Sequence, residues 1–73
     1  MDNDRLIRLP AVVAMTGLSR SKIYRRVAAG SFPPQTRLGP RTSAWCFHEV
    51  SAWINERIAE RDAPRSSWSR RRV

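Results

Sequence analysis

The chain has 73 residues, enough for one small hydrophobic core and too few for a catalytic cleft between two lobes. It carries 14 Lys and Arg against 6 Asp and Glu, a net charge of +8 that favours nucleic acid over anionic membrane surfaces as a partner. The single cysteine excludes an internal disulfide and the multi-cysteine zinc motifs. No apolar run approaches the roughly 20 residues of a membrane-spanning helix, so we expect a cytoplasmic protein. We also expect no metal and no cofactor.

Composition divides the chain into three parts. Residues 1–4 form a lead that we expect to be flexible, and residues 5–61 form a compact domain. Residues 62–73 form a basic tail, "DAPRSSWSRRRV", whose composition cannot build a core, so we expect it to be disordered. Residues 63–73 hold four basic and no acidic side chains, so half of the net charge lies on this short segment.

Helix start and stop signals predict two short helices separated by a tight turn. Proline opens the first helix, expected over residues 10–15, because its fixed φ and missing N–H cost nothing in a first turn. Gly17 can take the left-handed conformation that ends this helix, and Ser19 can cap the next one. The second helix is expected over residues 20–29, where Gly30 ends it and "FPP" prevents its continuation.

A hairpin and a third helix are expected to follow. The segment "TRLGPRTSAWCF" has the pattern of two short strands around a Gly-Pro turn, with Leu38 and Trp45 as inward-facing side chains. Over residues 48–61, apolar side chains recur at spacings of three and four, which predicts an amphipathic helix. Its apolar stripe consists of Val50, Trp53, Ile54 and Ile58.

Two short helices joined by "TGLS" are typical of a helix-turn-helix, whose second helix enters the major groove of DNA. At about 100° per residue, Ile23 and Val27 fall on one side of this helix. Ser21, Lys22 and Arg25 fall on the far side, and Arg26 flanks them. Long donors there can contact phosphates or the O6 and N7 acceptors of guanine, and Arg25 is the expected contact to base edges. The candidate DNA-contacting residues of this segment are Ser19, Arg20, Ser21, Lys22, Tyr24, Arg25 and Arg26.

The hairpin and the tail supply further candidates for DNA contact. A hairpin arginine can press on the backbone or enter a minor groove, although hairpin tips are polar in any protein. The tail arginines are expected to bind phosphates without sequence preference, with Trp68 as a stacking surface. These candidates are Arg37, Arg41 and Thr42 in the hairpin, and Arg70, Arg71 and Arg72 in the tail.

No catalytic arrangement is visible in the sequence. Cys46 is a lone thiol between two aromatic residues, which favours a structural role. His48 is the only histidine, and no nucleophile and carboxylate are spaced around it as an enzyme would need. We therefore expect a binding protein, with Trp45 and Trp53 in its core.

The segment over residues 5–61 resembles the AlpA-type regulators of phages and prophages, small proteins with a MerR-like helix-turn-helix. The resemblance rests on "RLP", "TGLSRSKIYR", "GSFPPQTRLGPR", the tryptophan that follows and "EVSAWI", taken together. It implies a winged helix-turn-helix: a mainly α fold of three helices with a small two-stranded β-hairpin as the wing. It also implies that the helix from Arg20 is the recognition helix and that the loop around Arg41 is the wing.

The sequence leaves three functions open. The leading hypothesis is a sequence-specific double-stranded DNA-binding regulator of phage, prophage or mobile-element genes. The resemblance also admits an excisionase that binds and bends attachment-site DNA to steer an integrase. A third possibility is a protein-interaction module that uses the helix of residues 48–61. Expected partners are double-stranded DNA, further copies of the chain, and an integrase or RNA polymerase, in the bacterial cytoplasm and associated with the nucleoid through DNA. No membrane or small-molecule partner is expected.

Overall fold

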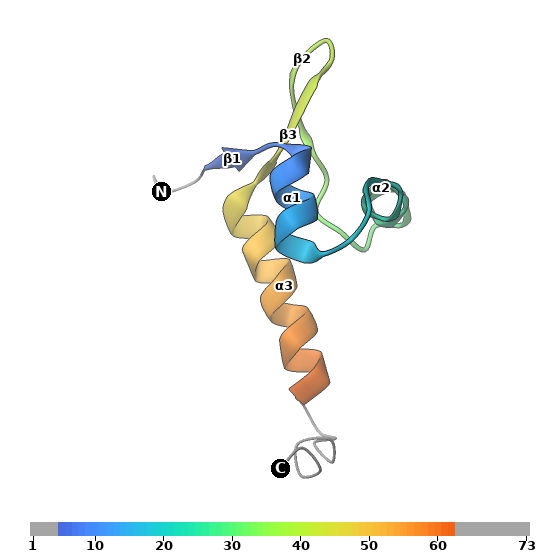
Figure 1. Cartoon of the computed structure of the whole chain (residues 1–73), viewed down its shortest axis with the longest axis vertical. Helices are drawn as coiled ribbons and strands as arrows, with labels where there is room; N and C mark the ends of the chain where they lie inside the picture. Colours follow the sequence, from blue (N-terminus) through green and yellow to red (C-terminus); the bar gives the residue numbers. More distant parts are fainter. Residues whose placement is uncertain (1–4, 63–73) are drawn as a thin grey trace.

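The computed structural model describes residues 5–62. In chain order it contains β1 (Leu6–Ile7), α1 (Leu9–Thr16), α2 (Arg20–Ala29), β2 (Thr36–Gly39), β3 (Thr42–Cys46) and α3 (Phe47–Asp62). The hairpin of β2 and β3 projects at one end, α3 extends toward the other, and α2 lies to one side (Figure 1). The predicted fold, mainly helical with a winged helix-turn-helix, is confirmed. Within residues 5–62 no helix is both long enough and apolar enough to cross a membrane.

The turn between α1 and α2 is held by a glycine and a threonine side chain. Gly17 has a φ of 77° and its N–H donates to the carbonyl oxygen of Val13 at 2.8 Å, which ends α1. The Thr16 hydroxyl donates to the carbonyl oxygen of Val12 at 2.8 Å and accepts from the N–H of Leu18 at 3.1 Å. These local bonds fix the direction in which the chain enters α2.

The ends of α2 follow the sequence rules. The Ser19 hydroxyl accepts a hydrogen bond from the N–H of Lys22 at 3.2 Å, so it caps the helix as predicted. Gly30 has a φ of 78°, and its N–H bonds to the carbonyl oxygen of Val27, which ends the helix. The predicted bounds of α2 are confirmed, and α1 is one residue longer at each end than predicted.

One hydrophobic core joins the helices to the sheet. Its members share almost complete burial and come from α1, α2, the loop before β2, β3 and α3. In that order they are Val12, Ile23, Phe32, Trp45 and Val50. The indole N–H of Trp45 is also satisfied, because it donates to the carbonyl oxygen of Pro33 at 3.0 Å. Burying a large apolar side chain contributes about 1.5–3 kcal/mol, so this cluster orients α2 against the rest of the fold.

The sheet has three strands in the order β1-β3-β2, with both pairs antiparallel. The sequence predicted the hairpin but not β1, because two residues are too few to display an alternating pattern. β1 owes its place to pairing with β3, where Leu6 lies opposite Cys46 and Ile7 opposite Trp45. The sheet therefore joins the start of the domain to the strand that leads into α3.

The prediction that Leu38 faces the core is wrong, since its side chain is 51% exposed. Arg37 pairs with Ser43 and Gly39 with Thr42, so Leu38 is the extra residue of a β-bulge. The hairpin at this point also projects beyond the core (Figure 1). The turn itself consists of residues 40–41, one position later than the predicted Gly-Pro turn.

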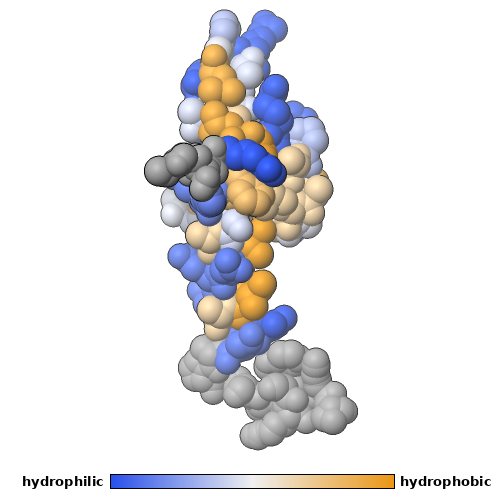
Figure 2. Space-filling view, turned by 90° about the vertical axis from the view of Figure 1, so that its left-hand side faces the viewer, coloured by the Kyte–Doolittle hydropathy of each residue, from blue (hydrophilic) through white to orange (hydrophobic). Residues whose placement is uncertain are grey.

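The amphipathic α3 packs on the core only through its first turns. Val50 is buried and Trp53 and Ile54 are half-buried, in agreement with the predicted apolar stripe. Ile58 is 43% exposed, because the last turns of α3 run past the other elements (Figure 1). In Figure 2, hydrophobic atoms gather in the middle of the molecule and continue down one side of α3.

Candidate nucleic-acid interface

Charge is divided sharply between α3 and the elements before it. Residues 5–48 carry eight cationic side chains and no acidic one. All the carboxylates within the described residues belong to α3, where Arg57 bonds to Glu60 at 2.9 Å and Arg61 to Asp62 at 2.9 Å. The hydrogen bond that Arg61 donates to Asp62, and then the negative charge of that carboxylate, raise the pKa of Arg61. The eight cations are Arg5, Arg8, Arg20, Lys22, Arg25, Arg26, Arg37 and Arg41.

α2 presents the two sides that its sequence predicts. Ile23 is completely buried and Val27 is half-buried against the core. Ser21, Lys22 and Arg25 are exposed, and within residues 5–62 none of these three side chains has a hydrogen-bond or ion-pair partner. This free polar side of α2 is called the outer face below. Its donors are available to an external acceptor.

The other candidates of α2 occupy different surroundings. The guanidinium of Arg26 lies 5.9 Å from the centre of the Trp53 ring, which places it on the side of α3. Tyr24 is 39% exposed and its ring centre lies 6.0 Å from that of Trp45. The Ser19 hydroxyl is engaged in capping, as described above. The structure therefore does not bring all the candidates of this segment onto one surface.

A hollow of about 210 Å³ brings α2 and the hairpin together. Arg20 and Tyr24 contribute to it from α2, and Arg41 contributes from the hairpin turn. Arg8, which is not among the sequence candidates, lines the same hollow. Sequence reasoning missed Arg8 because it lies far from both the turn motif and the hairpin in the chain.

The hairpin candidates lie at the projecting end of the molecule. Arg37 is exposed opposite Ser43, Arg41 is exposed in the turn, and Thr42 is half-buried at the start of β3. Figure 2 shows strongly hydrophilic residues at this end. The tail candidates Arg70, Arg71 and Arg72, like Trp68, lie outside the described residues.

A larger groove of about 620 Å³ lies between α3 and the loop after α2. Its walls include the aromatic rings of Phe32 and Trp53, and also the carboxylates Glu49 and Glu56. Arg57 also lines this groove, but it is paired with Glu56 and Glu60, so the groove offers no free cation to a phosphate backbone. α2 and the hairpin, in contrast, contain no carboxylate.

Two helices joined by a short turn, a second helix with a free cationic face and a basic hairpin define a winged helix-turn-helix protein. The chain belongs to the AlpA family, because residues 5–58 match the family model described as "Prophage CP4-57 regulatory protein (AlpA)". The resemblance predicted from the sequence is thereby confirmed.

Two relatives illustrate the family. The chain is 48% identical over 58 residues to "Uncharacterized protein ORF88" of Enterobacteria phage P4, an alignment covering 80% of this chain and 66% of the phage protein. It is 34% identical over 59 residues to "DNA-binding transcriptional activator AlpA" of Escherichia coli K12, covering 73% of this chain and 84% of that protein. The chain thus spans about two thirds of the length of the phage P4 protein.

Proposed function

We propose that the protein is a sequence-specific double-stranded DNA-binding regulator of phage, prophage or mobile-element genes. The observation that carries this proposal is the outer face of α2, where the side chains of Ser21, Lys22 and Arg25 have no hydrogen-bond or ion-pair partner within residues 5–62. The absence of carboxylates from residues 5–48 supports it, since nothing there repels a phosphate backbone. The printed name of the E. coli relative, a DNA-binding transcriptional activator, agrees with it.

In this proposal α2 enters the major groove, which is about 12 Å wide and admits one helix. Arg25 donates two parallel hydrogen bonds to the O6 and N7 atoms of a guanine, because its planar guanidinium matches that pair of acceptors. Ser21 and Lys22 contact bases or phosphates beside it. Arg37, Arg41 and Thr42 act from the hairpin on the flanking backbone, and the function requires no catalytic group, cofactor or metal.

One chain is too small to find a unique genomic site alone. A single recognition helix contacts only a few base pairs, so specificity requires a second copy, tandem binding or a protein partner such as an integrase or RNA polymerase. The length of DNA that the protein recognises must therefore be measured together with its sequence.

The direct experiment is selection of bound duplexes from a random DNA pool. The proposal predicts a short recurring motif, with a spacing between motifs if several copies bind. A recovered pool without any motif would contradict sequence-specific binding. Failure to retard any duplex at about 100 mM salt, a condition many basic proteins tolerate, would favour the protein-interaction alternative.

The same surface would serve an excisionase, and the position of the footprint separates the two roles. A regulator protects sequence that overlaps promoter elements. An excisionase protects several adjacent repeats beside an attachment site and bends them, which circular-permutation assays of the bound DNA would detect.

A further inference from the structure

The 210 Å³ hollow gathers arginines from three segments that are distant in sequence. Arg8 comes from the residue between β1 and α1, Arg20 from the first turn of α2, and Arg41 from the hairpin turn. No carboxylate lines the hollow, and no described carboxylate forms an ion pair with any of these three side chains. Gathering like charges is unfavourable by itself, so the arrangement suits a bound anion.

Arg8 is held in position by the sheet. Its Nε donates to the backbone carbonyl oxygen of Ser43 at 3.1 Å, a bond between residues 35 positions apart. That bond uses one of the five guanidinium N–H groups, so the two terminal nitrogens keep their donors for a ligand. A pre-positioned guanidinium loses less side-chain entropy on binding than a free one does.

The other walls also suit an anion of the size of a phosphate. Tyr24 and Ser43 bring hydroxyl-bearing side chains to the hollow, and Trp45 contributes an aromatic wall. The volume of about 210 Å³ admits a phosphate group with water. The three arginines are exposed at the surface, so the hollow is open to a large ligand and is not an enclosed site for a free ion.

We propose that this hollow binds one phosphodiester group of the DNA backbone, and that Arg8 is a DNA-contacting residue alongside Arg20 and Arg41. The inference rests on the proposed function and adds to it a fixed contact point between α2 and the wing. Contacts to phosphate carry no sequence information but set the position and orientation of a protein on the duplex. A single phosphate held between α2 and the hairpin would therefore fix how deeply α2 enters the groove.

The test compares Arg8→Gln with Arg61→Gln, which removes the same charge from the far end of α3. Binding is measured on a selected duplex and on an unrelated duplex across a series of salt concentrations. Arg8→Gln should weaken both complexes by a similar factor, on the order of tenfold, because a charge-assisted contact to phosphate is lost. The slope of log K against log salt should fall by about 0.9, the value for one phosphate contact, and Arg61→Gln should leave the slope unchanged.

A second arm locates the phosphate. Neutral methylphosphonate groups replace single phosphates of the selected duplex, one position at a time. At one position the substitution should lower the affinity of the wild-type protein and leave the affinity of Arg8→Gln unchanged. Arg41→Gln should lose the response at the same position, and it serves where Arg8→Gln proves unfolded by circular dichroism.

The outcomes are distinct. The hollow is not a backbone site if Arg8→Gln and Arg61→Gln have equal slopes of log K against log salt. The same holds if no methylphosphonate position weakens binding by the wild-type protein without weakening binding by Arg8→Gln. In either case DNA recognition by α2 stands. If inorganic phosphate binds the free wild-type protein saturably at millimolar concentration and Arg8→Gln abolishes that binding, the hollow is a free-anion site and the proposal is wrong. If the wild-type protein binds no duplex, the proposed function fails together with this inference.

Discussion

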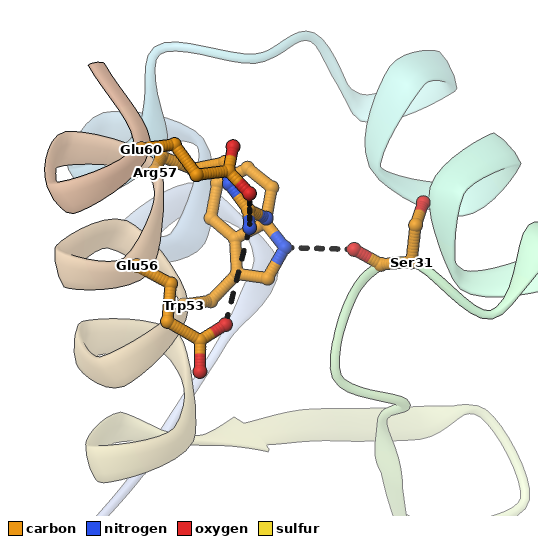
Figure 3. Close-up of polar contacts among 5 residues, drawn as sticks. All are labelled: Ser31, Trp53, Glu56, Arg57 and Glu60. Carbon is orange, nitrogen blue, oxygen red and sulfur yellow. Dashed lines mark hydrogen bonds and ion pairs between the residues drawn. The ribbon is translucent and has the colours of Figure 1, made fainter. Parts of the chain in front are cut away.

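The indole N–H of Trp53 donates a hydrogen bond to the backbone carbonyl oxygen of Ser31 at a distance of 2.7 Å (Figure 3). Ser31 follows the glycine that ends α2, so this bond ties α3 to the end of the proposed recognition helix. The guanidinium of Arg57 lies 5.0 Å from the centre of the Trp53 ring and bonds to Glu60, as Figure 3 shows. The orientation of α2 thus depends on α3, the helix that carries all the carboxylates of residues 5–62.

Replacing Trp53 by Phe should separate the hydrogen bond from the packing of the ring. Trp53→Phe removes the N–H donor and keeps an aromatic ring, so we expect the free energy of unfolding to fall by about 1 kcal/mol. Trp53→Ala should cost more, because the edge contact with Phe32 and the stacking of Arg57 are also lost. Urea denaturation measures both changes. A Trp53→Phe variant with the wild-type free energy of unfolding would show that the bond to Ser31 adds nothing.

Truncation should destabilise the protein strongly at Ile23 and hardly at all at Leu38. Ile23 is completely buried, so Ile23→Ala should lower the free energy of unfolding by about 2–5 kcal/mol. Leu38 occupies an exposed bulge, and Leu38→Ala should stay within about 0.5 kcal/mol of wild type. Thermal unfolding followed by circular dichroism compares the two. Comparable losses in both variants would contradict the bulge.

Gly30 and Gly39 should differ in their tolerance of alanine, because their backbone conformations differ. Gly30 has a φ of 78° with no atom near an added Cβ, so Gly30→Ala should cost about 1–2 kcal/mol through backbone strain alone. Gly39 has no positive φ, and its added Cβ would meet Thr42 at an ordinary 3.7 Å. Gly39→Ala is the matched control, expected to remain near wild type by chemical denaturation. Equal losses would mean that α2 does not end in the left-handed turn.

The sequence predicted the features that depend on neighbouring residues and missed those that depend on pairing across the fold. Caps and stops at Gly17, Ser19 and Gly30 follow from local hydrogen bonding, and these were predicted correctly. β1 could not be predicted, because two residues form a strand only by pairing with β3 about forty positions later. The exposure of Leu38 depends on a shift in register that no local pattern reveals.

In the candidate site, too, the residues set by local periodicity were predicted and those set by pairing across the fold were not. The outer face of α2 follows from helical periodicity, so Lys22 and Arg25 were found from the sequence. Arg8 joins Arg20 and Arg41 only because the sheet brings β1 beside β3, and no spacing in the chain indicates that neighbourhood. Arg26, predicted to flank the outer cations, has its guanidinium 5.9 Å from the centre of the Trp53 ring.

The central claim is that the outer face of α2 reads base sequence, and the most direct measurement is the affinity ratio between a selected duplex and the same duplex with its central motif scrambled. We predict that Arg25→Ala loses about 1–3 kcal/mol on the selected duplex and much less on the scrambled one, so the ratio falls roughly 5- to 150-fold. Arg61→Ala, at the end of α3, is the control and should keep the wild-type ratio. An Arg25→Ala protein that retains the wild-type ratio would contradict the assignment of α2 as the recognition helix.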